Sequence, residues 1–119
     1  MDEFYFPLFL DKLRYRPELQ SVTLSNLSLG AKSSKALIHR AKSLKALSLV
    51  NIKLYQIPIA DFLLDFGENP TSLQRLALVE MNLSGRYIKE LKKIIDINPK
   101  LDDLNLARNA FTKANLFAL

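Results

Sequence analysis

The chain has 119 residues, the length of one small domain, and with 49% apolar and 24% charged residues its composition is that of a folded globular protein rather than a disordered one. The absence of cysteine excludes disulfide bonds, thiolate metal sites and cysteine nucleophiles, and it predicts a reducing compartment. No apolar run is long enough to span a bilayer, and the acidic residues near the start do not fit a secretory signal. We therefore expect a cytoplasmic or nuclear protein that is not secreted and has no transmembrane segment.

The net charge of +5 arises in one part of the chain. No acidic residue lies between Glu18 and Asp61, whereas six basic residues lie in this window. Such a cluster attracts anionic partners, and added salt weakens the attraction. The basic residues of the window are Lys32, Lys35, Arg40, Lys42, Lys45 and Lys53.

Residues 1–18 have the pattern of a helix with no strand before it. Phe6, Phe9 and Leu13 recur at spacings of three and four, which places them on one face of a helix. Pro7 suits the first helical turn, where its missing N–H is not needed. The segment is either an N-terminal capping helix or half of a repeat from a longer protein.

From residue 19 onward one leucine pattern occurs four times. The first leucines of the four copies are 25, 29 and 28 residues apart. A period in the twenties indicates an internal structural repeat, which makes 1–119 a single domain. The full repeats are 19–43, 44–72 and 73–100, and the incomplete last one is 101–119.

Each copy opens with the pattern of a strand. Leu47 and Leu49, like Leu104 and Leu106, alternate with other residues and so point to one face of an extended chain. Each such leucine contributes ~1.5–3 kcal/mol when it is fully buried. Because no copy can bury its own leucine face, the fold depends on contacts between neighbouring copies.

Helical patterns follow the strands at 31–42, 57–66 and 85–97, with Ser84 as the expected N-cap of the third. Asn69 and Asn98 each precede a proline, which ends a helix because the residue before proline is pushed out of the helical conformation. After Phe111 a further helix begins. Its inward residues are either Ala114, Phe117 and Ala118 or Leu116 and Leu119, and its apolar end favours truncation over docking of a further repeat or a neighbouring subunit.

The LxxLxL cores, the LxxLxLxxNxF stretch at 101–111 and the intervening helices resemble the leucine-rich repeat family. The helix-bearing repeats of 25–29 residues are similar to its ribonuclease-inhibitor-like branch, and the resemblance covers residues 6–119. It implies an α/β fold, a short horseshoe-shaped solenoid with a parallel sheet on the concave side and helices on the convex side. It also implies a surface that holds another macromolecule.

One position departs from the family pattern. The family usually has Asn or Cys at the ninth position after the first leucine, where the side chain bonds the backbone of the turn. Asn109 occupies this position in the last copy, but Leu27, Ile52 and Met81 occupy it in the others. Either the first three turns are satisfied in another way, or the predicted register is locally wrong by one residue.

The outward strand positions form a candidate protein-binding face. Adjacent strands lie about 4.8 Å apart, so Arg75 beside Asp103 and Glu80 beside Arg108 can pair. These pairs are either plain surface ion pairs, worth ~0–1 kcal/mol each, or contacts for a protein ligand. The candidate binding residues are Arg75, Glu80, Asp103, Asn105 and Arg108.

The basic helix at 31–42 is the second candidate site, with Lys32, Lys35, Arg40 and Lys42 as an anion-binding patch. It is either a solvated helix face or a contact for nucleic acid, anionic lipid or an acidic protein. No aromatic residue lies between Tyr15 and Tyr55, and aromatic residues are what nucleic-acid binders use to stack bases.

No catalytic motif is complete. The stretch after Gly30 lacks the upstream glycine of a phosphate-binding loop, because Ser25 stands in its place. His39 is the one histidine of the chain, and Asp61 and Asp65 fit a solvated helix face. The sequence therefore predicts a non-enzymatic protein-protein interaction scaffold without cofactor or metal, a segment or subunit of a larger intracellular protein or assembly. The alternative is a basic RNA- or phosphate-associated module acting through the helix at 31–42.

Overall fold

The computed structural model describes residues 19–119. The helix predicted within 1–18, with Phe6, Phe9 and Leu13 on its apolar face, lies outside the described residues.

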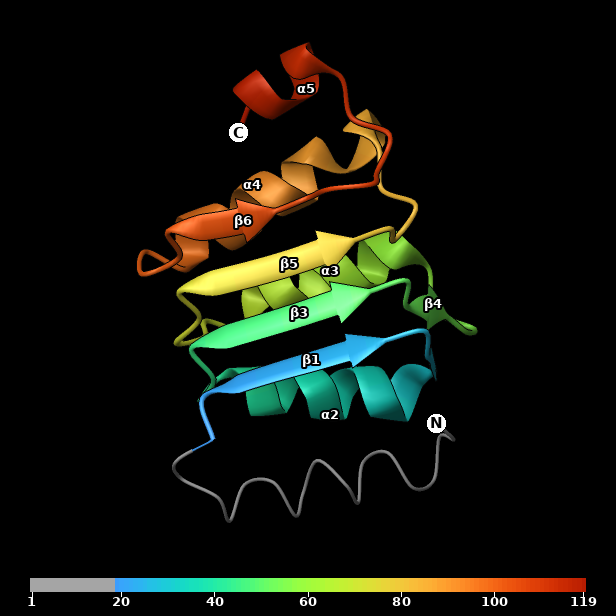
Figure 1. Cartoon of the computed structure of the whole chain (residues 1–119), viewed down its shortest axis with the longest axis vertical. Helices are drawn as coiled ribbons and strands as arrows, with labels where there is room; N and C mark the ends of the chain where they lie inside the picture. The colour runs from blue at the N-terminus through green and yellow to red at the C-terminus, as the bar shows by residue number, and fades with distance from the viewer. Residues whose placement is uncertain (1–18) are drawn as a thin grey trace.

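Four parallel strands form the main sheet in the order β1-β3-β5-β6, which is also their order in the chain (Figure 1). Val22, Leu47, Leu76 and Leu104 are register partners across the sheet, as the leucine pattern predicts. A slip of one residue would turn every leucine to the other face, so the buried face specifies this register. The strands are β1 (Ser21–Ser25), β3 (Ala46–Val50), β5 (Arg75–Val79) and β6 (Asp103–Asn105).

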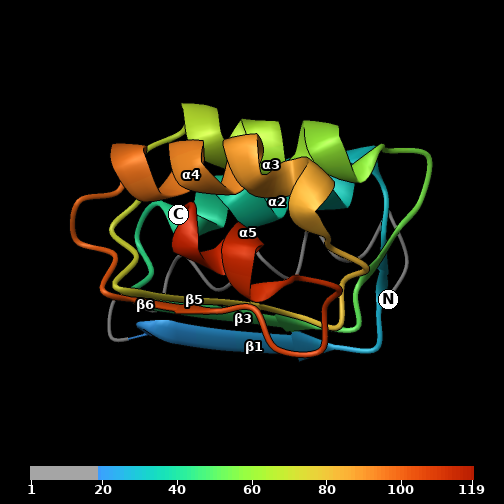
Figure 2. The same ribbon diagram turned by 90° about the horizontal axis from the view of Figure 1, so that it is seen from above.

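Helices connect consecutive strands and lie on one face of the sheet, as Figure 2 shows from above. Parallel strands need such crossover connections, because each chain must return to the same end of the sheet. The described chain is thus a mixed α/β structure with a parallel sheet and a helical layer. The helices of this layer are α2 (Ala31–Ala41), α3 (Ile59–Glu68) and α4 (Ile88–Ile97), with the 3-10 turn η1 (Gly85–Tyr87) before α4.

Two helix starts differ from the predictions. Helix α3 begins at Ile59 rather than 57, because Pro58 forces Ile57 out of the helical conformation, and it ends two residues later than predicted. The third helix opens as the 3-10 turn η1, and the side chain of Ser84 makes no capping hydrogen bond there. The two Asn-Pro motifs do end their helices, as predicted, with Asn69 and Asn98 as C-caps of α3 and α4.

The core lies between the sheet and the helices. Leu47, Leu49 and Leu78 are almost fully buried, and Phe62 and Phe66 of α3 pack edge to face with ring centroids 5.3 Å apart. The same leucine positions in β6 are only partly buried, since β6 is an edge strand of the described sheet. Val22 of β1, the other edge strand of the described sheet, is also only partly buried, so burial is greatest in the two central strands.

Beyond the main sheet the chain forms a short lateral ladder. Strand β2 (Ser28–Leu29) pairs with β4 (Lys53–Leu54) in a separate two-stranded sheet. Further along, Ser84 pairs with Ala110 in an isolated parallel bridge.

The last helix, α5 (Lys113–Phe117), is capped by Thr112, whose hydroxyl accepts from the Asn115 N–H at 3.2 Å. Phe117 is 87% exposed, so the inward set Ala114, Phe117 and Ala118 is wrong, and of the other set only Leu119 packs against the core. None of the described helices has the length and apolar character needed to cross a membrane.

Candidate interaction site

One face of the main sheet is not covered by any described element. Parallel sheets are normally packed on both faces, so an uncovered face is unusual. The side chains that point away from the helices are small or polar apart from two valines, and all are exposed or half-buried. We call this surface the open sheet face; it consists of Ser21, Thr23, Ser25, Ala46, Ser48, Val50, Arg75, Ala77, Val79, Asp103 and Asn105.

Two of the charged candidates, Arg75 and Asp103, lie side by side at the starts of β5 and β6. Arg75 and Asp103 are register partners as predicted, but no ion pair joins them within the described chain. Both are exposed, where water and side-chain entropy offset the attraction of a single pair, and both charges are therefore available to a partner. Asn105 is also exposed, although its Oδ1 accepts a 3.0 Å bond from the Ala107 N–H.

The second predicted pair forms. A nitrogen of the Arg108 guanidinium lies 3.7 Å from a carboxylate oxygen of Glu80, with side chains 72% and 47% exposed. Both residues have positive φ, 58° and 56°, as do Asn26 and Asn51 at the equivalent positions of the first two copies. The backbone ladder continues through this position, and the Asn51 side chain donates a 2.8 Å bond to the Oδ1 of Asn26.

Because positions 26, 51, 80 and 108 are equivalent, the predicted register can be checked at the ninth position of each copy. The register is correct, and the turns before Asn109 are satisfied differently. Asn109 accepts 3.0 Å bonds from the N–H groups of Met81 and Leu83 and donates a 2.7 Å bond to the Leu78 carbonyl. Between the first two copies the backbone itself supplies the bonds, for example from the Lys53 N–H to the Leu27 carbonyl at 2.9 Å.

The anion-binding patch is smaller than predicted. Lys32, Lys35 and Lys42 are exposed on α2, but Arg40 is 7% exposed and its guanidinium donates to the Ser43 hydroxyl. Arg40 lies three residues after Leu37 and so shares the inward stripe of the helix, a signal that helical spacing already carries.

Carboxylates face the remaining lysines of α2. Asp65 of α3 lines a hollow of about 260 Å³ together with Lys35 and Lys42. Asp61 and Asp65 line a neighbouring hollow of about 340 Å³, again beside Lys35. These negative charges lower the positive potential of the helix toward a polyanion. Within residues 19–119 no group of three or more His, Cys, Asp or Glu side chains is arranged to hold a metal ion.

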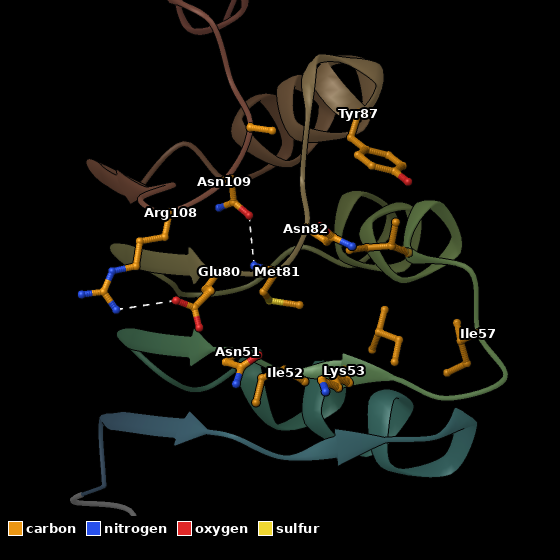
Figure 3. Close-up of a pocket in the computed structure, with 13 residues that line it drawn as sticks. Asn51, Ile52, Lys53, Ile57, Glu80, Met81, Asn82, Tyr87, Arg108 and Asn109 are labelled. Atoms are coloured by element: carbon orange, nitrogen blue, oxygen red, sulfur yellow. Dashed lines mark hydrogen bonds and ion pairs between the residues drawn. The ribbon is translucent and has the colours of Figure 1, made fainter.

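A larger groove, of about 770 Å³, lies beside the lateral ladder. Lys53 lies on one side of it and Asn82 and Tyr87 on the other (Figure 3). We call it the edge groove. Sequence reasoning missed it; the signal available was the extra length of the repeat 44–72, whose loop carries Ile57 to the rim.

Comparison of the chain with models of protein families, with curated proteins and with solved structures found no match.

Proposed function

We propose that the chain is a leucine-rich repeat protein of the ribonuclease-inhibitor-like branch, a short horseshoe-shaped solenoid with its parallel sheet on the concave side. The proposal is supported by four strands that follow one another through the sheet in chain order, with equivalent leucines in register. It is also supported by the bonds of Asn109, which join the turn of the last copy to that of the copy before it.

The function that the geometry supports best is non-enzymatic binding of another protein on the open sheet face, as a segment or subunit of a larger intracellular assembly in the cytoplasm or nucleus. The observation that carries this proposal is that no element of residues 19–119 covers one face of the parallel sheet. Small side chains such as Ser48 and Ala77 allow a bulky partner to approach the backbone, while Arg75 and Asp103 supply charges that are not paired with each other. Unpaired charges at the rim of such a surface set the orientation and the association rate of a partner.

The alternative, an RNA- or phosphate-associated module, is favoured by the three exposed lysines of α2, but the carboxylates of Asp61 and Asp65 beside Lys35 oppose it. Phosphate binding would also depend steeply on salt concentration.

Two matched variants separate the functions. The first carries Arg75→Glu and Asp103→Lys on the open sheet face, and the second carries Lys32→Gln, Lys35→Gln and Lys42→Gln in α2 and at its C-cap. Proteins captured by the wild type and quantified by mass spectrometry should be lost from the first variant and kept by the second. Binding of a single-stranded RNA oligonucleotide, measured at two salt concentrations, should be weak in all three chains. RNA binding that disappears in the second variant would overturn the protein-binding proposal, as would protein capture that neither variant alters.

A further inference from the structure

The edge groove exists because the lateral ladder is interrupted. Strand β4 pairs with β2 on one side, and Ser84 pairs with Ala110 on the other. In the main sheet the second and third copies stay in contact, since the Asn51 N–H bonds the Val79 carbonyl at 2.9 Å. Past this bond the two backbone segments separate, and no backbone hydrogen bond of the described residues joins β4 to residues 82–84.

The backbone of β4 therefore has an unpaired edge. The N–H groups of Lys53 and Tyr55 both bond the preceding copy, at 2.9 Å to the Leu27 carbonyl and at 2.8 Å to the Leu29 carbonyl. Successive residues of a strand direct their backbone groups to opposite sides, so the N–H and C=O of Leu54 point into the edge groove. Such an edge is a template for pairing with another strand.

The far wall is bonded to the following copy rather than to β4. The Leu83 carbonyl accepts a 2.8 Å bond from the Ala110 N–H, and the Leu83 N–H donates to Asn109 at 3.0 Å. Both backbone groups of Leu83 are thus used by the following copy. Leu83 therefore contributes no backbone group to β4, and the gap beside Leu54 stays open.

The side chains around the groove are suited to an extended peptide. Leu54, Ile57, Ile59 and Tyr87 are partly buried and pack against the core, so they present an apolar wall to the groove. Among the described lining residues, Glu80 and Arg108 neutralise each other, whereas the exposed Lys53 has no ion pair. The groove therefore offers one positive charge beside apolar surface and an unpaired backbone edge.

We propose that the edge groove binds an extended segment of a partner protein, which adds to β4 as a strand and places an acidic side chain against Lys53. Main-chain hydrogen bonds to Leu54 hold the segment, and its alternate side chains pack on the apolar wall. The site lies outside the open sheet face, so it does not depend on the binding of a partner there.

The test follows individual amides by NMR hydrogen exchange on the full ¹⁵N-labelled chain. The probe is a pool of end-blocked peptides, each roughly six to nine residues long, the usual length of a strand, with apolar residues alternating with Glu or Thr. In the free chain the Leu54 amide should exchange about tenfold or more faster than the bonded amides of Lys53 and Tyr55, which serve as internal controls. Addition of the pool should slow exchange at Leu54 and leave the two controls unchanged.

Two further pools, N-methylated at odd or at even positions, test the mode of binding. A strand pairs with an edge through alternate residues, so methylation should abolish protection of Leu54 in one pool and spare it in the other. Protection of Leu54 already in the free chain, no gain of protection with any pool, or equal binding of both methylated pools would each overturn the proposal.

Charge-reversal variants test the acidic side chain. Lys53→Glu should weaken binding of the Glu-containing pool by about tenfold and restore binding of a matched Lys-containing pool. Lys92→Glu, an exposed change on α4 away from the groove, should leave both affinities unchanged. Arg75→Glu should also have no effect here, which separates this site from the open sheet face. Unaltered affinity in Lys53→Glu would show that the segment is not acidic and would overturn the proposal.

Discussion

Asn98 binds Thr71 twice, accepting a 2.8 Å bond from its backbone N–H and another 2.8 Å bond from its hydroxyl. Asn98 is 3% exposed and also donates a 2.8 Å bond to the Ile94 carbonyl. One buried amide thus ends helix α4 and ties it to the loop before β5. The Asn-Pro motif, chosen from the sequence as a helix stop, also links two copies of the pattern.

Asn98→Ala should lower the free energy of unfolding by ~2–4 kcal/mol, because it leaves the half-buried N–H of Thr71 and the buried carbonyl of Ile94 without partners. The measurement is urea unfolding, read as a shift of the midpoint at constant m. Asn69→Ala is the matched control. Asn69 is half-buried and donates a single bond, to the Asp65 carbonyl, so its loss should be about 1 kcal/mol. Equal losses in the two variants would contradict the linking role of Asn98.

Leu76→Ala should cost ~2–5 kcal/mol, because Leu76 is 2% exposed in a central strand and its removal leaves a cavity. Leu104→Ala is the matched control, since Leu104 is the register partner of Leu76 in the edge strand and is only partly buried. It should cost clearly less in the same urea titration. A loss under about 1 kcal/mol for Leu76→Ala would mean that the inward positions are wrongly assigned.

The double variant Glu80→Asn and Arg108→Asn should be as stable as the wild type or more stable, by up to about 1 kcal/mol. Asn adopts the left-handed conformation more readily than Glu or Arg, and it already occupies the equivalent positions 26 and 51. The ion pair that is lost is exposed and worth only ~0–1 kcal/mol. Thermal and urea unfolding measure the change. A clear destabilisation would assign the Glu80–Arg108 pair a larger structural role than its exposure indicates.

Arg40→Gln should destabilise the chain by ~1–3 kcal/mol, because the side chain of Arg40 is buried in the last turn of α2 and its guanidinium bonds Ser43. Lys35→Gln, an exposed change on the same helix, should stay within about 0.5 kcal/mol of the wild type. Comparison of the two unfolding midpoints tests whether Arg40 belongs to the core side of the helix. Equal and small effects would mean that Arg40 belongs to the exposed anion-binding patch, as first predicted.

Local periodicity accounts for most of the agreement between sequence and structure. Alternating leucines such as Leu47 and Leu49 specify both the strand and its buried face, and the register follows because a one-residue slip would expose them. Helix α2 was predicted to within one residue at its end, and the Asn-Pro stops were placed correctly. The candidate pair Glu80 and Arg108 followed from the same register.

The sequence by itself determined the strands of the main sheet and the face that each buries, because side chains alternate along a strand, and it determined their order because the pattern repeats along the chain. Only the tertiary structure decided which charges pair and where the lateral ladder is interrupted. Arg75 and Asp103 are as close in register as Glu80 and Arg108, yet only the second pair forms. At the edge groove Leu83 bonds the copy after it while β4 bonds the copy before it, and the choice between these distant partners is made in the tertiary structure.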